Sequence, residues 1–384
     1  MKIAIDLTYS PVGGALTQIL HFVNIFNKIE GLDIVIYSKK SNDNILSDIT
    51  KNNKIVYSRI SNLTIFGRIF WGQLFLPFHL KKIKADILFC PGNHGPIFSS
   101  VKTIIWIGTI GPLLEEFVKY SYWTSKHHNK FKLYLNKFFM LNSSRTAKGI
   151  IFESEFTKDL FVKEFNIKKS NSYVINIGND AYFSNKNSDD LTGLDPSLVS
   201  NSKYILCVSH LYPYKNIIRL LFAYKQTLDN NKTPAKLIIA GNKDFNKYID
   251  EINKKIVELN LQHNVEMLGS VSKKNLKYLY SNAYLLVFPS PFENFAYTLV
   301  EAMSCGTPIV CSNTTAMPET CKNAALYFDP YNSNEMAKQM SLVIENEDLR
   351  KTMSEKSLAR SKELPDYKEV AYEVIEIMRG IVND

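Results

Sequence analysis

Two glutamates eight residues apart follow a short apolar segment in the second half of the chain. Glu293 lies in the proline-marked run Phe288-Pro289-Ser290-Pro291-Phe292-Glu293-Asn294-Phe295. That run predicts a strand, a loop and then a helix whose apolar face includes Leu299 and Met303, with Glu301 two turns beyond Glu293. Helical spacing would place the two carboxylates on the order of 12 Å apart. They therefore cannot share one ligand atom, but they can hydrogen-bond to the two ends of one extended ligand.

The start of this predicted helix is suited to an anion. In open α/β sheets, ligands bind where the carboxyl end of a strand leads into a helix. Backbone N–H groups near residues 297–299 and the helix dipole would both attract a diphosphate there. Spacing alone equally allows Glu293 to be a helix-start carboxylate and Glu301 a solvated charge, so the surrounding sequence has to decide.

The elements that would position these residues are parallel β-α units. Short apolar runs alternate with helix-length amphipathic segments along nearly the whole chain, a pattern typical of parallel sheets. Strands are predicted at residues 2–6, 33–37, 86–90, 103–107, 149–153 and 173–176, and in the second half at 204–209, 236–241, 265–267, 284–288, 308–312 and 325–328. The second half is the more regular doubly wound domain.

Two domains are expected from a chain of 384 residues. Residues 184–203 are rich in Asn, Ser, Asp and Gly, and this composition predicts a linker. The predicted domains are residues 1–190 and 200–365. A final amphipathic helix at 366–384 follows Pro365 without a later strand, and we expect it to pack back across the first domain.

Composition narrows the class of partner and of compartment. Lysine and arginine exceed aspartate and glutamate by 46 to 37, a net charge of +9 that favours phosphate, nucleic acid or an acidic membrane surface. The five cysteines form no Cys-x-x-Cys pair, so they predict neither a disulfide framework nor a zinc site. Asp189-Asp190 in the linker is interpreted as a solvated pair, and no metal is assigned.

Neither an export signal nor a membrane span is predicted. The first six residues are typical of a buried strand rather than a signal peptide. The most apolar window, residues 63–80, is interrupted by Arg68, Gln73, Pro77 and His79. We therefore expect a cytoplasmic protein.

The segment around the two glutamates resembles family 4 glycosyltransferases. The similarity rests on Glu293-Asn294-Phe295-Ala296, on Leu299-Val300-Glu301-Ala302-Met303-Ser304-Cys305-Gly306-Thr307-Pro308-Ile309-Val310 and on Pro318-Glu319. It extends to Ser209-His210-Leu211-Tyr212-Pro213-Tyr214-Lys215-Asn216, Leu268-Gly269-Ser270-Val271, Ser154-Glu155-Phe156-Thr157-Lys158 and, weakly, Gly13-Gly14. It implies an α/β GT-B fold: two Rossmann-like doubly wound domains facing across a cleft, with the C-terminal helix on the N-terminal domain.

The resemblance also implies a division of roles. Residues 1–190 would bind the acceptor and residues 200–365 the nucleotide sugar. Lys215 would hold the donor diphosphate, Glu293 would orient the sugar, and Glu301 would bind the ribose. Further donor-binding candidates are His210, Asn294, Phe295, Ala296, Thr298, Leu299, Val271, Gly13 and Gly14. Lysine and backbone amides would replace a metal, so no cofactor is expected, and an α-linked UDP- or GDP-sugar would give an α-glycoside with retention.

Three positions depart from the family pattern. His210 stands where an arginine commonly accompanies the lysine, and a histidine with a pKa near 6.5 need not be charged at pH 7. Ala296 stands where glycine is usual, and its methyl group can narrow the pocket or tilt the loop. Many relatives carry a His-Asp pair where this chain has Gly108-Thr109. Thr109 and His94 remain acceptor-side candidates, although a purely structural role for His94 stays open.

The first domain carries a basic and aromatic surface candidate. Residues 117–148 combine seven lysines and arginines with eight aromatic residues and contain no acidic residue, and residues 59–84 add more of both kinds. Such composition predicts peripheral binding to an anionic membrane surface, unless the aromatic residues are core and the lysines a solvated face. No RNA-binding motif is present, so nucleic acid is not the expected partner.

The sequence thus favours a metal-independent hexosyltransferase that acts on a glycan or lipid-linked acceptor. Bacterial surface polysaccharide assembly, of lipopolysaccharide O-antigen or capsule, at the inner face of the cytoplasmic membrane is the expected setting. Two alternatives stay open. The substitutions at His210 and Ala296 allow a non-catalytic GT-B scaffold for another transferase, whereas intact Lys215, Glu293 and Glu301 favour activity. An epimerase or a phosphorylase on the same fold lacks supporting motifs here.

Overall fold

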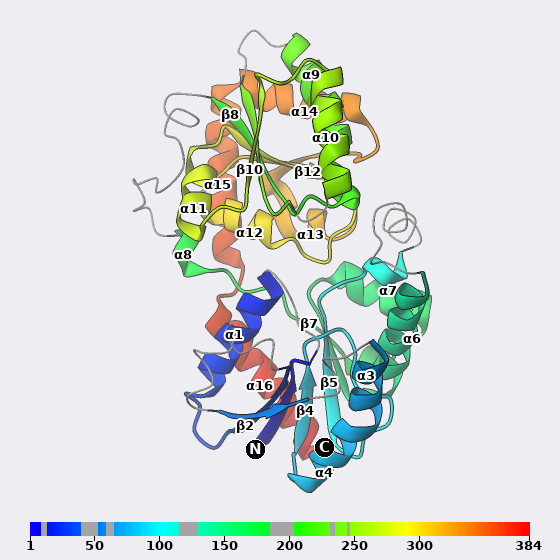
Figure 1. The fold of residues 1–384 in the computed structure, drawn as a ribbon. Helices are drawn as coiled ribbons and strands as arrows, with labels where there is room; N and C mark the ends of the chain where they lie inside the picture. Colours follow the sequence, from blue (N-terminus) through cyan, green and yellow to red (C-terminus); the bar gives the residue numbers. More distant parts are fainter. Residues whose placement is uncertain are drawn as a thin grey trace. The chain divides into compact units, whose positions relative to one another are not determined.

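The structure of the 384-residue chain is a computed structural model that describes residues 1–8, 14–39, 53–58, 65–114, 130–184, 203–230, 235–243 and 246–384. It contains two compact units (Figure 1). The first comprises Met1–Pro112, Phe131–Gly178 and Pro365–Asp384, and the second holds Asn179–Leu364. The chain passes between them at Gly178 and Asn179, a few residues before the predicted linker. Most of that linker, with Asp189-Asp190, lies outside the described residues.

The first unit is built on a seven-stranded parallel sheet in the order β3-β2-β1-β4-β5-β6-β7. Its strands are β1 (Lys2–Asp6), β2 (Asp33–Ser38), β3 (Lys54–Tyr57), β4 (Ile87–Cys90), β5 (Lys102–Ile107), β6 (Gly149–Phe152) and β7 (Ser172–Val174). The six predicted strands are confirmed, with ends shifted by one or two residues. The sequence analysis missed β3, because this four-residue edge strand is only half-buried and has no clear apolar run.

Helices cover both faces of this sheet. Figure 1 shows α1 (Gly14–Phe26) and α16 (Tyr367–Asn383) on one side, and α3 (Ile65–Phe70), α4 (Leu76–Lys82), α6 (Lys130–Thr146) and α7 (Glu155–Phe165) on the other. A π-helix, Trp71–Phe75, joins α3 to α4. Short 3-10 helices occupy Gly111–Leu113 and Lys169–Asn171.

The C-terminal helix packs on the first unit, as predicted. Asp366 and Glu369 form a capping box at the start of α16, which fixes where the helix begins. Its apolar stripe, including Val374 and Met378, is fully buried in the same core as Phe22 of α1. At its far end, Lys102 Nζ donates to the carbonyl oxygen of Ile381 at 2.9 Å. The helix therefore completes the hydrophobic core of a unit that begins more than 360 residues earlier in the chain.

The second unit repeats the arrangement with six parallel strands in the order β10-β9-β8-β11-β12-β13. The strands are β8 (Tyr204–Val208), β9 (Lys236–Ala240), β10 (Val265–Gly269), β11 (Leu285–Phe288), β12 (Ile309–Ser312) and β13 (Ala325–Phe328). The helices are α8 (Ala181–Ser184), α9 (Ile217–Asn230), α10 (Asn246–Glu258), α11 (Lys273–Asn282), α12 (Tyr297–Ser304), α13 (Met317–Cys321), α14 (Ser333–Glu345) and α15 (Glu347–Glu363), with 3-10 turns at Pro213–Lys215 and Lys322–Ala324. All six predicted strands are confirmed.

The strand order of the second unit reverses between β8 and β11. These strands are neighbours, with Ile205 paired to Leu285, but the chain leaves them toward opposite sides of the sheet. A doubly wound sheet has an opening at such a reversal, beyond the carboxyl ends of the two strands. The loops that follow β8 and β11 are therefore the ones that the fold places around a ligand.

Within the described part of the chain, no helix has the length and apolar character to cross a membrane. The apolar window of residues 63–80 is instead broken into α3, the π-helix and α4. Leu76 and Leu80 of this stretch are fully buried in the first unit, whereas Phe78 between them is exposed.

Candidate functional site

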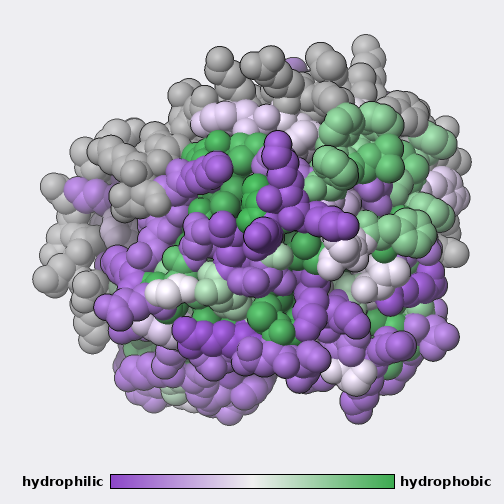
Figure 2. All heavy atoms as spheres, turned by 90° about the horizontal axis from the view of Figure 1, so that it is seen from below, coloured by the Kyte–Doolittle hydropathy of each residue, from purple (hydrophilic) through white to green (hydrophobic). Residues whose placement is uncertain are grey.

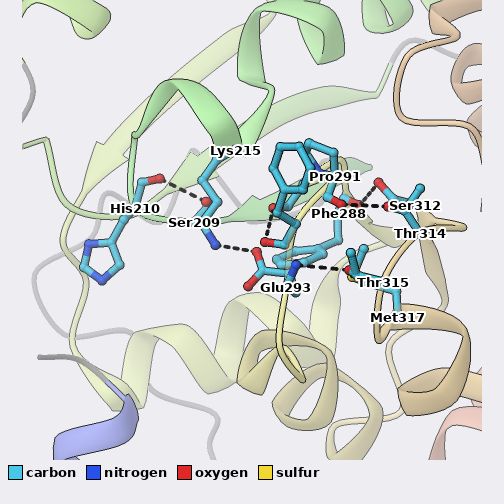
Figure 3. Close-up of polar contacts among 12 residues, drawn as sticks. Ser209, His210, Lys215, Phe288, Pro291, Glu293, Ser312, Thr314, Thr315 and Met317 are labelled. Carbon is cyan, nitrogen blue, oxygen red and sulfur yellow. Dashed lines mark hydrogen bonds and ion pairs between the residues drawn. The ribbon is translucent and has the colours of Figure 1, made fainter. Parts of the chain in front are cut away.

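Lys215 and Glu293 meet in the second unit, although 78 residues separate them in the sequence (Figure 3). Lys215 lies in the loop after β8 and Glu293 in the loop after β11, so the reversal of strand order brings them together. The Lys215 ammonium donates to Glu293 Oε1 in a short ion pair. Their side chains are only 13% and 14% exposed. The two residues with the main predicted roles thus form one partly desolvated pair.

The backbone around Lys215 is fixed by its neighbour Asn216. Asn216 has a left-handed conformation, with φ of 64°, which ends the 3-10 turn Pro213–Lys215. Its buried side-chain amide donates to the carbonyl oxygens of Pro289, at 3.0 Å, and Pro330, at 2.7 Å. Arg219 in turn donates to Asn216 Oδ1 at 2.7 Å. Asn216 therefore ties the lysine loop to the loops that follow β11 and β13.

The Lys215 side chain is held as a cation. Burial lowers its pKa, but the charge of Glu293 and a hydrogen bond to it outweigh that effect and raise the pKa to about 12. The ammonium also lies 5.0 Å from the ring centroid of Tyr214 and 5.9 Å from that of Phe288. A fixed positive charge at the carboxyl edge of the sheet is suited to a phosphate group.

The loop that carries Glu293 is held by threonines that the sequence analysis did not single out. The Glu293 backbone N–H donates to Thr315 Oγ1 at 3.1 Å, and Thr314 Oγ1 donates to the Pro291 carbonyl oxygen at 2.9 Å (Figure 3). Both threonines follow β12, the strand next to β11. The polar run Ser312-Asn313-Thr314-Thr315 directly after a predicted strand was the available signal.

Ala296 has a backbone conformation that favours glycine. Its φ of 75° and ψ of 81° are left-handed, and it caps the start of α12 without a side-chain hydrogen bond. The methyl group is therefore tolerated at a conformational cost.

The start of α12 offers fewer free amides than the sequence predicted. The Leu299 N–H donates to the Ala296 carbonyl oxygen at 3.0 Å, so it is used within the helix start. The side chains of Phe295 and Leu299 are 1% and 0% exposed, and Asn294 is also buried, whereas Thr298 is half-buried. The predicted contacts of Phe295 and Leu299 with a ligand can therefore come only from the backbone.

Glu301 follows the first turn of α12 and is not a solvated helix charge. It accepts a hydrogen bond from the Tyr280 hydroxyl at 3.0 Å. Burial raises the pKa of Glu301 to about 7, against the lowering effect of that hydrogen bond. Burial and the nearby Glu301 also raise the pKa of Tyr280, so the hydroxyl remains a donor. Tyr280 on α11 was not identified from the sequence as a partner of Glu301.

The other predicted donor residues of the second unit are spread around this edge. His210 is exposed, and its ring points away from the Lys215–Glu293 pair (Figure 3). The loop that carries it lies tightly on Gly241, where an added Cβ would come within 1.8 Å of the Ser209 carbonyl oxygen. Val271 is half-buried in the loop after β10. The His210 ring is thus not in contact with the ion pair.

The first unit has its own reversal of strand order, between β1 and β4. The loop after β4 carries His94, which is 7% exposed and lies 6.5 Å from Phe139, measured between ring centroids. The preceding Asn93 accepts hydrogen bonds from the Thr109 N–H, at 3.0 Å, and the Gly108 N–H, at 2.7 Å. Gly14 is the first residue of α1, and Gly13 lies outside the described residues. The two acceptor-side candidates therefore share the carboxyl edge of this sheet.

No group of three or more His, Cys, Asp or Glu side chains among the described residues is placed to hold a metal ion. The five cysteines are free thiols in the structure.

Comparison with known proteins finds a family match in the second half of the chain. Residues 195–360 match the family model described as glycosyl transferases group 1. The chain is 28% identical over 220 residues to the O-antigen chain mannosyltransferase B of Escherichia coli, which covers 57% of each chain. It is 30% identical over 195 residues to the O-antigen chain mannosyltransferase RfbU of Salmonella typhimurium, which covers 50% of each. The matches thus span only about half the length of these curated relatives.

A likeness of fold extends over the whole chain. The crystal structure of Anabaena HepE in complex with UDP superposes with a TM-score of 0.76 at 17% identity, covering 99% of both chains. At that identity the comparison concerns the fold. It places the two parallel sheets with their flanking helices in the GT-B class, which agrees with the predicted architecture.

Proposed function

We propose that the whole protein is a retaining glycosyltransferase, a proposal that the match of residues 195–360 to the glycosyl transferases group 1 family model supports. It transfers a hexose from an α-linked UDP- or GDP-sugar to a glycan or lipid-linked acceptor. The observation that carries this proposal is the Lys215–Glu293 pair at the strand reversal of the second unit. A cation and a carboxylate in contact at that edge can bind the diphosphate and the sugar of one donor.

In this proposal Lys215 is the main charge on the donor. The bond between the anomeric carbon and the diphosphate oxygen breaks, and negative charge grows on that oxygen. A positioned ammonium beside it lowers the barrier, and loss of one such group typically costs about 100- to 1000-fold in rate. Glu293 holds the ammonium in the free protein and accepts hydrogen bonds from sugar hydroxyls in the complex. Glu301 accepts from the ribose.

The acceptor step needs no general base from the protein. The acceptor hydroxyl oxygen forms a bond to the anomeric carbon on the face that the diphosphate leaves, and its proton passes to the departing phosphate oxygen. The configuration is therefore retained. Positioning and charge stabilisation supply the catalysis, and no metal is required when lysine and backbone amides neutralise the diphosphate.

The acceptor is proposed to bind the first unit, at the edge that carries Asn93, His94 and Thr109. The relatives named as O-antigen chain mannosyltransferases support a role in bacterial surface polysaccharide assembly. A mannose donor and a lipid-linked acceptor are the corresponding substrates. Such an acceptor places the protein in the cytoplasm, in peripheral contact with the inner face of the membrane.

A thermal-shift panel of UDP, GDP and their hexose conjugates tests the donor site. A ligand at a hundred times its dissociation constant stabilises the fold by about 2.7 kcal/mol. We expect one base family to raise the melting temperature of the wild type and to have no effect on Lys215→Ala. Lys338→Ala is the matched control, because it removes an exposed lysine of α14 in the same unit, outside the loops after β8 and β11. It should keep most of the shift.

The scaffold alternative predicts a different outcome. A non-catalytic GT-B protein would show no shift with any nucleotide, or a shift without transfer of radiolabelled sugar to a membrane extract. Binding of one donor together with its slow hydrolysis in water, both lost in Lys215→Ala, would exclude the scaffold.

A further inference from the structure

Positive charge is concentrated in one stretch of the sequence. Residues 49–152 contain 15 lysines and arginines but only three acidic residues, Asp86, Glu115 and Glu116. The remainder of the chain has more acidic than basic residues, because the net charge of the whole protein is +9. The basic character of the protein is thus a property of this stretch, and not of the donor-binding unit.

The same stretch exposes large hydrophobic side chains. Phe98 is 81% exposed and Phe78 is 76% exposed, the highest values among the large hydrophobic residues in the described parts of the chain. Leu74, Phe70 and Phe75 on the neighbouring turns are 43% to 58% exposed. Each such side chain would gain roughly 1.5–3 kcal/mol on full burial, so a cluster of them marks an interaction surface.

The fold brings the two most exposed phenylalanines to one hollow. Gln73 in the π-helix accepts from the Ile97 N–H at 2.8 Å and donates to the Gly95 carbonyl oxygen at 3.1 Å, which holds the loop before Phe98 against the helix. A cavity of about 640 Å³ opens beside that loop. We call it the lysine–phenylalanine pocket; its defining residues are Leu74, Phe78, Lys81, Phe98, Lys102 and Lys148.

The charges of this pocket are of one sign. Three lysines line it, and no acidic residue does. Lys102 Nζ is bound to the carbonyl oxygens of Ile381 and Val382, at 2.9 and 3.2 Å. Lys81 and Lys148 are exposed, and neither forms an ion pair within the described ranges. Two ammonium groups beside two exposed aromatic rings match a ligand with an anionic head and an apolar body.

The pocket is separate from the acceptor-side residues of its own unit. Lys102 is the first residue of β5 and Lys148 directly precedes β6, so the pocket lies at the amino ends of these strands. Asn93, His94 and Thr109 lie beyond the carboxyl ends. Helix α6, which carries the exposed Phe131 and Phe138, covers the same side of the sheet as α3 and α4 (Figure 1).

Figure 2 shows the molecule from below, the end at which α4 is labelled in Figure 1. Hydrophobic and hydrophilic residues lie next to one another on this face. Such a mixture of aromatic and cationic side chains lets the rings enter the apolar boundary of a bilayer while the ammonium groups remain at the headgroups. We propose that the lysine–phenylalanine pocket docks the first unit on an anionic bilayer, with a phospholipid headgroup phosphate between Lys81 and Lys148 and with Phe78 and Phe98 inserted beside it.

This inference deepens the proposed function, since a lipid-linked acceptor gives the docking its purpose. The binding itself can nevertheless be tested without donor or acceptor. The full-length protein is mixed with phosphatidylcholine vesicles, with or without phosphatidylglycerol, and the bound fraction is measured by flotation. The test variant is Phe78→Ser/Lys81→Glu on α4. Its matched control is Lys338→Glu/Leu342→Ser on α14, which changes an exposed lysine and an exposed apolar residue of the second unit.

We expect the wild type to bind only the anionic vesicles. One lysine at an anionic surface contributes about fivefold to binding, so charge reversal with loss of the ring should weaken it by at least about tenfold. The control variant should bind like the wild type, and both variants should keep the wild-type melting temperature and its shift with nucleotide. Phe98→Ser/Lys148→Glu, which changes two lining residues outside α4, should repeat the loss.

Several results would overturn the proposal. If the wild type binds neither kind of vesicle, or binds both equally, an anionic headgroup is not what the pocket recognises. Unchanged vesicle binding by both pocket variants would do the same. A dimer that the pocket variants dissociate would assign the surface to a second copy of the chain. Loss of nucleotide binding by the wild type, with vesicle binding intact, would count against the proposed function alone.

Discussion

The two parallel sheets share a strand order at their centre but place different chemistry at the reversal. In the second unit the loops after β8 and β11 bring a buried cation and a carboxylate into contact. In the first unit the described residues at the ends of β1 and β4 include side chains that accept hydrogen bonds from nearby residues. There Asp6, at the end of β1, accepts from Thr8 Oγ1 at 2.6 Å, and Asn93 accepts from two backbone N–H groups.

Burial affects the charge of the two sites differently. It raises the pKa of the Asp6 carboxyl, which moves that group toward the neutral form. Lys215, by contrast, keeps its charge because Glu293 more than offsets the effect of burial. The same topology thus gives a charged site in one unit and a less charged, hydrogen-bonded edge in the other. Fold alone does not decide chemistry; the residues at the strand ends do.

The strongest test of this difference is the stability cost of breaking the charged pair. Lys215→Met leaves the Glu293 carboxylate partly buried without its partner, and we expect a loss of about 3–5 kcal/mol in the free energy of unfolding. The double variant Lys215→Met/Glu293→Gln should recover much of that loss. Urea unfolding followed by circular dichroism measures both.

The matched variant in the first unit is Asn93→Ala. It leaves two backbone N–H groups without their acceptor, and we expect a loss of about 1–3 kcal/mol. Because it lies in the other unit, its effect should add to that of Lys215→Met. If Lys215→Met and the double variant have the same free energy of unfolding, the unpaired Glu293 carboxylate costs no stability. The proposed electrostatic difference between the two units would then be wrong.

Glu301 sharpens the comparison through pH. Its pKa is raised from 4.5 to about 7 in the folded protein, so between these values the folded state binds more protons than the unfolded state. Its contribution to stability is therefore fully present below about pH 4.5 and falls by up to about 3 kcal/mol as the pH rises to 7. Unfolding measured at pH 5 and pH 8 should show a larger decrease for the wild type than for Glu301→Gln. Identical pH slopes would mean that Glu301 is not buried as described.

The smallest expected effect concerns Ala296. A residue with a Cβ loses roughly 1–2 kcal/mol of stability in this left-handed conformation. Glycine avoids that cost, but its greater conformational freedom in the unfolded chain offsets part of the gain. Ala296→Gly should therefore stabilise the second unit by about 1 kcal/mol. Ala302→Gly, in the interior of α12, should destabilise it by at least about 1 kcal/mol. If both variants lose stability, backbone conformation does not explain why glycine is usual at this position in the family, and contact with a ligand is the better explanation.

The sequence predicted the sheets better than the contacts that hold the site. Twelve of the thirteen strands followed from short apolar runs between helix-length segments, because a strand buried on both faces needs such a run. The edge strand β3 is half-buried and has no such requirement. The roles of Thr315 and Tyr280 were not predicted either, because their partners are distant in the sequence. Thr315 lies in a loop 22 residues from Glu293, and Tyr280 lies in a helix 21 residues from Glu301.

By itself, the sequence determined the two-domain α/β architecture, the C-terminal helix of the first unit and the motif residues Lys215, Glu293 and Glu301, because local periodicity and short motifs carry that information. Only the tertiary structure decided which side chains meet. It joined Lys215 to Glu293 across 78 residues, buried Glu301 against Tyr280, and left Phe78 exposed between buried Leu76 and Leu80. Burial and contact depend on how distant elements pack, and no local pattern in the chain encodes that packing.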